Sequence, residues 1–205
     1  MRLVHVLIII AVTASNLIAA DIGVIGAKTW TDDADIGDPE GLGIFVTDRV
    51  SEHFRLQLEY RYFRHEREVL GWITSQWQPV YGDPELLKSV TTYNAFDADV
   101  LVEIWRLGRF GIECGPGISM NNVSLKRIST DVNPTSDDRS VSRLGLSFTT
   151  RVSTRPVSTS PFRLNLSFKA KHIRADKTQL QDSWTPYEDG LGIYELSIGL
   201  AYIFD

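Results

Sequence analysis

Apolar and polar side chains alternate along residues 54–64 of the chain. A period of two places all the apolar side chains of an extended strand on one face and the polar ones on the other, whereas a helix would scatter them around its axis. The stretch is therefore predicted to be a β-strand with one apolar and one charged face. Its length, about ten residues, is also that of a tilted strand crossing a bilayer.

The same alternation recurs along the rest of the chain, and no apolar run beyond the first residues is long enough for a membrane helix. The predicted strands are 22–30, 41–47, 54–64, 93–105, 110–120, 144–152, 162–172 and 194–204. Their connections alternate long, short, long, short, long, short, long. In an up-and-down barrel such alternation gathers long loops at one rim and tight turns at the other. The predicted fold is all-β: an eight-stranded antiparallel up-and-down transmembrane β-barrel.

Pro116 interrupts the fifth predicted strand, within Gly115-Pro116-Gly117. Proline has no N–H to donate to a sheet ladder, and a closed sheet has no free edge that would excuse the missing donor. We therefore expect a local bulge or a weakened ladder at this point.

Alternation alone does not say which face of a closed barrel is inside. A soluble lipocalin-like carrier would turn Leu56, Leu58, Leu164 and Leu166 inward around a ligand, whereas a membrane barrel would turn them toward lipid. Charges of both signs on the polar faces, which suggest bases opposite acids on the third and fourth strands, favour a lumen in which charges pair. The predicted polar network of the lumen comprises Arg55, Glu59, Arg61, Asp97, Asp99, Glu103, Glu113, Arg143, Arg151, Arg163, Lys169, Lys171 and Glu195.

The aromatic residues of the predicted apolar face support the membrane alternative. Aromatic residues near the predicted strand ends resemble the two interfacial girdles of membrane barrels. They are Phe54, Tyr60, Tyr62, Phe110, Phe162, Tyr194, Tyr202 and Phe204.

Residues 1–20 have the features of a secretory signal peptide: a basic start, an apolar run and a small-residue exit at Ala19-Ala20. Residues 21–205 would then form one barrel domain. Removal of residues 1–20 would remove Arg2 and no acidic residue, which leaves a formal charge of −6 and argues against nucleic-acid binding. Cys114 is the single cysteine of the chain, so no internal disulfide is available to stabilise the fold.

Three segments carry a resemblance to a known family: 45–60, 110–118 and the closing 196–204. Together they resemble the porin-like outer-membrane β-barrel domain proteins, the eight-stranded relatives of the OmpA/OmpX type. The resemblance covers nearly all of the chain after residue 20, and it implies insertion into the bacterial outer membrane by the barrel-assembly machinery. Chains of this type usually end on an aromatic residue, whereas here Asp205 follows Phe204.

Candidate chemistry is sparse, and we expect no enzymatic activity, no cofactor and no metal. His172, at the loop end of the seventh strand, would suit a lipid A deacylase-like enzyme, but no serine follows it at a matching spacing. Acidic residues 32–40 miss the spacing of a calcium loop. Trp72, Trp77 and Tyr81, in the longest predicted loop, are candidate binding anchors.

The sequence thus predicts a monomeric outer-membrane barrel with periplasmic termini and extracellular long loops. Outer-membrane lipid surrounds it, and an extracellular ligand or surface is its expected partner. Its role is structural or surface-interacting rather than that of an open pore, since eight strands leave a lumen just wide enough for side chains. The alternatives are the lipid-modifying enzyme and the soluble carrier.

Overall fold

The computed structural model describes residues 20–31, 38–71, 85–129, 136–157, 159–173 and 191–204. Within these ranges the chain forms eight strands and no helix, and none of the described residues forms a helix that could cross a membrane. The strands are β1 (Ala20–Thr31), β2 (Glu40–Arg49), β3 (Phe54–Gly71), β4 (Glu85–Leu107), β5 (Phe110–Ser129), β6 (Ser136–Thr154), β7 (Phe162–Ile173) and β8 (Leu191–Ile203).

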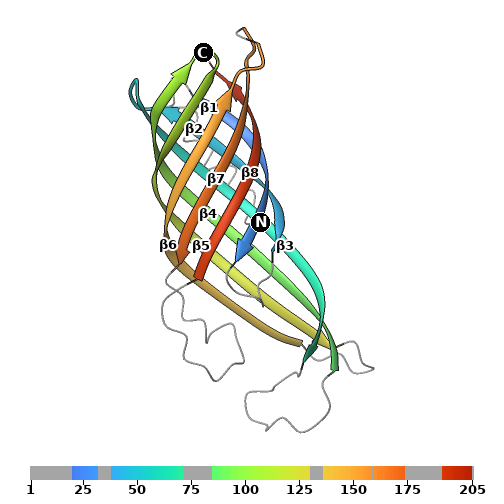
Figure 1. Cartoon of the computed structure of the whole chain (residues 1–205). Coiled ribbons are helices and arrows are strands. Elements are labelled where there is room, and N and C mark those ends of the chain that lie inside the picture. The colour runs from blue at the N-terminus through green and yellow to red at the C-terminus, as the bar shows by residue number, and fades with distance from the viewer. Residues whose placement is uncertain are drawn as a thin grey trace.

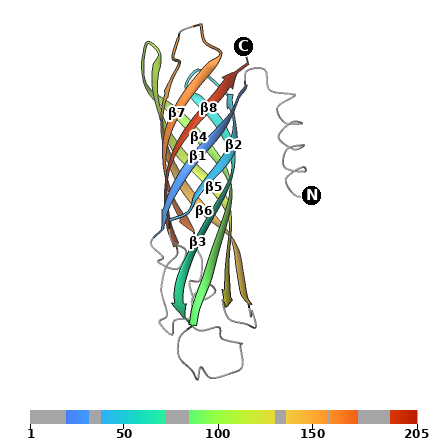
Figure 2. The same cartoon turned by 90° about the vertical axis from the view of Figure 1, so that its right-hand side faces the viewer.

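Each strand pairs antiparallel with the next, and β1 pairs with β8 from Asp21↔Ile203 to Thr31↔Ile193. The sheet therefore closes on itself into an elongated barrel whose strands are tilted relative to its long axis (Figures 1 and 2). Closure leaves no free strand edge within the ring, which is what a sheet surrounded by hydrocarbon needs. The predicted eight-stranded up-and-down barrel is confirmed.

The alternating pattern decides which side chains point into the barrel. On β7 the odd-numbered positions from Arg163 to Ile173 are buried, whereas most of the even-numbered side chains between them are exposed. Large apolar side chains are exposed on all eight strands, for example Leu42 at 74%, Leu144 at 72% and Leu146 at 69%, and an apolar surface this extensive is rare in water-soluble folds. The apolar face is therefore the outside of the barrel.

Leu56, Leu164 and Leu166 are exposed on this outer face, at 39%, 42% and 47%. They line no interior cavity, so the lipocalin-like alternative is wrong. The physical reason is that charged side chains of the described strands fill the interior, which leaves no apolar cavity for a ligand there.

Two connections predicted as long loops are largely strand. β3 continues to Gly71 and β4 begins at Glu85, although 65–92 was predicted to be a loop, and most of the predicted loop 121–140 belongs to β5 and β6. In these extensions polar residues occur on both faces, so the clean alternation that marks the other strand segments is missing. The remaining connection between β5 and β6, at 130–135, is no longer than the β6–β7 connection at 155–161. This hairpin therefore extends beyond the other strands because β5 and β6 are long, and not because of a long loop.

The extensions carry β3 to β6 beyond the closed ring. β2 pairs with β3 only as far as Glu40↔Arg64, and β7 pairs with β6 only as far as Ile173↔Gly145. Past these pairs β3, β4, β5 and β6 continue as an open four-stranded sheet, which we call the projecting sheet. It extends at the lower end of the barrel in Figures 1 and 2, opposite the short turns and the C-terminal end of β8.

The ladder weakens at Pro116, as predicted. The pairing of β4 with β5 keeps one register from Asp99↔Gly117 to Val102↔Cys114, but it omits Val100 and Leu101, which lie opposite Pro116 and Gly115. The register shift itself falls on the neighbouring strand, between Glu103 and Trp105 of β4. The missing proline donor thus interrupts the pairing, and the extra residue is accommodated a few positions closer to the turn.

Near β1 and β8 the aromatic side chain of Phe45 fills part of the interior, in a space left by glycine. Phe45 lies buried against Ile25 and Ala201. A Cβ atom added at Gly23 would lie 2.5 Å from the Phe45 ring and 2.5 Å from the Leu200 carbonyl oxygen. Gly23 therefore has to lack a side chain for Phe45 to occupy this position.

A valine tests this packing at Gly23, with Gly26 on the same strand as its matched control. Gly26 points outward, and a Cβ there would approach only Leu42, at 3.9 Å. We expect Gly23→Val to lower the free energy of unfolding by about 1–3 kcal/mol through overpacking, and Gly26→Val to change it by less than about 0.5 kcal/mol. The measurement is the temperature at which the folded, fast-migrating gel band converts to the unfolded one. Equal conversion temperatures for the two variants would contradict the packing argument.

Candidate functional site: the charged barrel interior

Twelve charged side chains of the described residues are buried inside the barrel, and their signs balance. Six are acidic and six are basic. The acidic side chains are Asp21, Glu59, Asp97, Asp99, Glu113 and Glu195, and the basic ones are Arg55, Arg61, Arg151, Arg163, Lys169 and Lys171. Because an isolated buried charge is costly, a neutral total is the condition under which such an interior can exist.

Lys169 lies at the centre of the network. Its Nζ atom is 2.7 Å from Glu59 Oε2, 2.9 Å from Asp97 Oδ2 and 2.7 Å from Asp99 Oδ2. An ammonium group carries three N–H donors, and here each has a different carboxylate as its partner. The lysine comes from β7 and the carboxylates from β3 and β4, so these ion pairs cross the lumen.

A second set of contacts lies one step closer to the long-loop end. Lys171 Nζ is 2.9 Å from both Asp97 Oδ2 and Glu195 Oε1, and it donates to the Tyr93 hydroxyl at 3.1 Å. Arg61 forms ion pairs with Glu59 and Glu195. Shared carboxylates thus connect β3, β4 and β7 with β8 in one continuous network.

Beyond Tyr93 the interior becomes apolar toward the long-loop end. Tyr93 stacks on Phe63 with the ring centroids 5.2 Å apart, and both rings are fully buried. The rest of this layer consists of Ala95, Val123, Ile173 and Ile193. The lumen is therefore filled by a charged layer and an apolar layer in succession.

Toward the short turns the network continues around Glu113. Its carboxylate accepts from Arg55 Nε at 2.7 Å and from Arg151 Nε at 2.7 Å. Asp21 forms an ion pair with Arg163 and lies 3.7 Å from Arg55. The guanidinium groups here are planar forks, which suit contacts with more than one carboxylate oxygen.

Eleven of the thirteen residues predicted for the lumen are buried in it. Arg143 is not: it is exposed, because Gly145 is the last residue of β6 that pairs with β7 and Arg143 lies beyond it on the projecting sheet. Glu103 is only partly buried, at the short-turn end, where it pairs with Arg106. For both residues the alternation gives the correct face, but it does not reveal where along the strand the closed ring ends.

The predicted pairing of bases with acids on neighbouring strands is wrong for β3 and β4. In the observed register Glu59 lies opposite Asp97, and Arg61 lies opposite Ala95. Lys169 instead bridges these two acids from across the lumen, while Glu59 also pairs with Arg61 and Asp97 with Lys171. An eight-stranded barrel is narrow enough for a lysine side chain to reach the opposite wall.

Several members of the network were missed in the sequence. Tyr93, which also donates to Asn121 at 2.7 Å, is the first residue of the predicted strand 93–105 but not a member of the predicted network. Asp21 was treated as the first residue after a signal peptide. Thr47 donates to Gln57 at 3.1 Å, and the predicted network contains no uncharged residue of this kind. All lie on inward positions of their strands. Thr47, Gln57 and Tyr93 fall inside predicted strands and share the polar face with charged residues, and Asp21 lies one residue before a predicted strand, so the period of two carried through every residue of that face would have found them.

The other candidate residues fall outside this network. Trp72, Trp77 and Tyr81, like residues 1–19 and 32–37, lie outside the described residues. His172 is exposed on the outer face of β7, and its cross-strand neighbours Leu146 and Gly192 carry no nucleophile. Within the part of the chain that the structure describes, no group of three or more His, Cys, Asp or Glu residues could hold a metal ion.

The projecting sheet carries its charges on the surface. Glu66 lies 2.7 Å from Lys88 Nζ and accepts from Arg64, which is on the same strand. Donation from Lys88 and Arg64 holds the pKa of Glu66 below its usual value. These side chains follow Tyr62, the last aromatic residue of the outer apolar face on β3, so the sheet lies beyond the lipid-facing belt.

The central cluster yields a test of stability. Replacement of Lys169 by methionine keeps the length of the side chain but leaves three buried carboxylates without their shared cation. We expect a loss of about 3–5 kcal/mol in the free energy of unfolding, measured by urea titration in lipid vesicles with tryptophan fluorescence as the readout.

The matched control is Lys28→Met, which removes an exposed lysine 3.2 Å from Glu40. Exposed pairs contribute little, so this change should cost less than about 1 kcal/mol. If the two substitutions had the same effect, the cluster would not stabilise the barrel.

Comparisons with known proteins agree with this geometry. No protein-family model matches the sequence, and the search of curated proteins finds no match. Among solved structures, the chain is similar to a major outer membrane protein from Thermus thermophilus, at 13% identity and a TM-score of 0.61 over 90% of this chain and 99% of that one. It is also similar to OprG from Pseudomonas aeruginosa, at 11% identity and a TM-score of 0.56 over 92% and 96%.

A third similar structure is Ail, the attachment invasion locus protein of Yersinia pestis, solved in complex with the heparin analogue sucrose octasulfate. The identity is 13% and the TM-score is 0.52, over 91% of this chain and 97% of that one. Identities this low establish the fold alone. The chain has the fold of the eight-stranded outer-membrane β-barrels, in agreement with the resemblance to the OmpA/OmpX type seen in its sequence.

Proposed function

We propose that this chain is a monomeric protein of the bacterial outer membrane whose barrel holds the projecting sheet and its loops at the cell surface for interaction with an extracellular ligand or surface. The observation that carries the proposal is the contrast between the two halves of the molecule. The ring is closed and filled, whereas β3 to β6 continue beyond it as an open sheet.

The outer face supports the membrane part of the proposal. Its apolar side chains form a continuous belt around the ring, bordered by aromatic residues. Phe162 packs edge-to-face on Tyr202, which packs in turn on Phe204, near the short turns, and Phe168 stacks on Tyr194 toward the other end. Aromatic side chains at two levels of an apolar belt are typical of barrels held between two membrane interfaces.

The filled interior supports a role other than that of a pore. Lys169 and Lys171 are nearly or fully inaccessible to solvent, and Phe63 and Tyr93 cover them toward the long-loop end. A solute would have to displace both the ion pairs and the apolar layer. We also expect no catalysis, because the outward-facing His172 has no nucleophile among its cross-strand neighbours.

The proposed orientation places the long loops outside the cell and the short turns in the periplasm. An epitope inserted within 130–135 should then be bound by antibody on intact cells. The same epitope inserted within 155–157 should be bound only after the outer membrane is permeabilised. Both insertions should leave the protein in the outer-membrane fraction as a heat-modifiable band. Exposure of the second epitope on intact cells would contradict the orientation, and a soluble periplasmic protein would contradict the membrane location.

The aromatic residues of the connection between β3 and β4 are the proposed binding anchors. We expect the triple substitution of Trp72, Trp77 and Tyr81 by serine to reduce attachment of expressing cells to an immobilised extracellular-matrix surface at least roughly tenfold, because aromatic anchors carry much of the energy of such contacts. The matched control is Trp105→Ser, which removes an exposed tryptophan at the short-turn end. Attachment unchanged by the triple substitution, with the folded gel band retained, would remove these residues from the proposal.

A further inference from the structure

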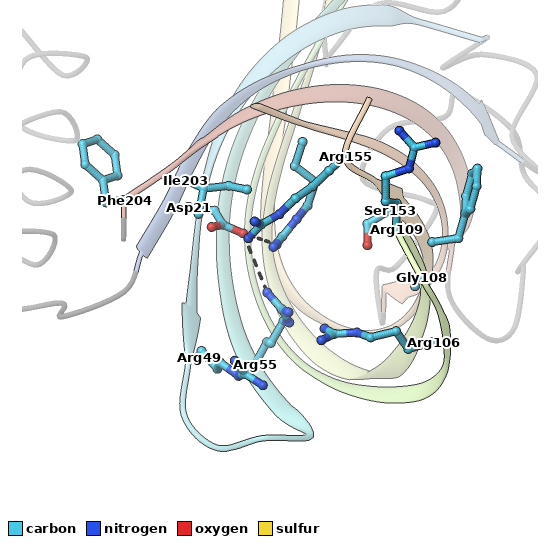
Figure 3. Close-up of a pocket in the computed structure, with 13 residues that line it drawn as sticks. Asp21, Arg49, Arg55, Arg106, Gly108, Arg109, Ser153, Arg155, Ile203 and Phe204 are labelled. Carbon is cyan, nitrogen blue, oxygen red and sulfur yellow. Dashed lines mark hydrogen bonds and ion pairs between the residues drawn. The ribbon is translucent and has the colours of Figure 1, made fainter. Parts of the chain in front are cut away.

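The short-turn end of the barrel opens into a hollow in whose lining arginine is the commonest residue. Its volume is about 360 Å³, room for on the order of ten water molecules. Six guanidinium groups line it, and Figure 3 shows the labelled ones gathered around its opening with Asp21. The six are Arg49, Arg55, Arg106, Arg109, Arg155 and Arg163. We call this hollow the arginine vestibule.

The charges of the vestibule do not balance, unlike those of the interior beneath it. Arg55 and Arg163 belong to the buried set of six acids and six bases, and Glu103 pairs with Arg106. The remaining three, Arg49, Arg109 and Arg155, form no ion pair with any carboxylate of the described residues. Arg49 donates instead to the backbone carbonyls of Ser51 and Glu52, at 3.3 Å each.

The rim that carries these arginines is held together by contacts between two turns. Arg109 Nη1 donates to the Pro156 carbonyl at 2.6 Å, and the Arg155 N–H donates to the Arg109 carbonyl at 3.3 Å. These bonds fix the β4–β5 turn against the connection that follows β6. Arg109 lines the hollow, and the bond to Pro156 uses one of its five N–H donors.

The lining residues also indicate what the hollow would bind. Phe110, Gly111 and Ser153 line it beside the arginines, and Asp21 is its only carboxylate among the described residues. Three guanidinium groups without a carboxylate partner match a dianion better than a monoanion. Planar guanidinium forks bind pairs of oxygens on carboxylates and on phosphates alike, but a phosphate offers further oxygens and a second negative charge to the neighbouring guanidinium groups.

We propose that the arginine vestibule binds a phosphate group, either as free phosphate or a phosphate ester or as the phosphate of a lipid headgroup. The hollow lies inside the ring of strands and opens at the short-turn end (Figure 3). Its placement in the periplasm rests on the proposed membrane orientation, but binding itself does not, so the two can fail separately.

The test uses the full barrel folded in a phosphate-free detergent such as octyl glucoside. Isothermal titration with inorganic phosphate should give saturable binding at low ionic strength. The double variant Arg109→Gln/Arg155→Gln should bind at least roughly tenfold more weakly, because charge-assisted guanidinium contacts to phosphate are lost. The control Arg64→Gln removes an exposed arginine at the start of the projecting sheet, at the other end of the barrel, and should bind as the native protein does.

A second arm distinguishes the two sources of the phosphate. Barrels in nanodiscs of phosphatidylcholine are compared with barrels in nanodiscs containing phosphatidic acid, and retained lipid is counted by native mass spectrometry. Retention of phosphatidic acid that depends on Arg109 and Arg155, without binding of inorganic phosphate, would assign the site to a lipid headgroup. Binding in neither arm, or an equal loss in Arg64→Gln, would overturn the proposal. All variants are first checked for the heat-modifiable folded band, so that misfolding is not taken for lost binding.

Discussion

The fold depends on one constraint: charges that are taken out of water inside the barrel must neutralise one another there. The outside of the ring is apolar, so the charged faces of the strands have to point inward, and an eight-stranded ring leaves them no water-filled channel. Six acidic and six basic side chains meet this condition. Because Lys169 and Arg61 join strands on opposite walls, neutralisation also ties the ring together across its lumen.

Glycines shape the inner surface next to both the charged network and an apolar cluster. Where β1 meets β2 and β8, an apolar cluster fills the interior, and the Phe45 ring occupies the space left by Gly23. On the other side, a Cβ at Gly117 would collide with the Asp99 carboxylate and with Ser147, which donates to Asp99 at 3.0 Å. Glycine there leaves room for a carboxylate that Lys169 requires. The inner surface is thus shaped around the charged network on one side and around an aromatic ring on the other.

The period of two was sufficient to predict the strands, their faces and eleven of the thirteen lumen residues, because one face had to be apolar wherever lipid covers it. It failed where lipid does not. On the projecting sheet His65, Thr91 and Asn122 belong to strand segments with polar residues on both faces. Such strands are paired through backbone hydrogen bonds, which leave no alternating pattern in the sequence. It also could not give the partners in the lumen. Glu59 and Asp97 lie side by side in the register, and only the closed geometry brings Lys169 between them.

The two ends of the barrel carry different distributions of charge, and both differ from the balanced interior. Inside the ring the number of acids and bases is fixed by the cost of burial, so the interior has little freedom to change its charge. Water covers the two ends, and this restriction is lifted there. At the long-loop end the strands have polar residues on both faces and carry charges of both signs, such as Arg64, Glu66 and Lys88. The short-turn end has an excess of a single sign, carried by Arg49, Arg109 and Arg155 around a hollow that is itself wide enough for a ligand. An excess of one sign costs self-repulsion that mixed charges avoid, and an anion bound between the guanidinium groups would relieve it.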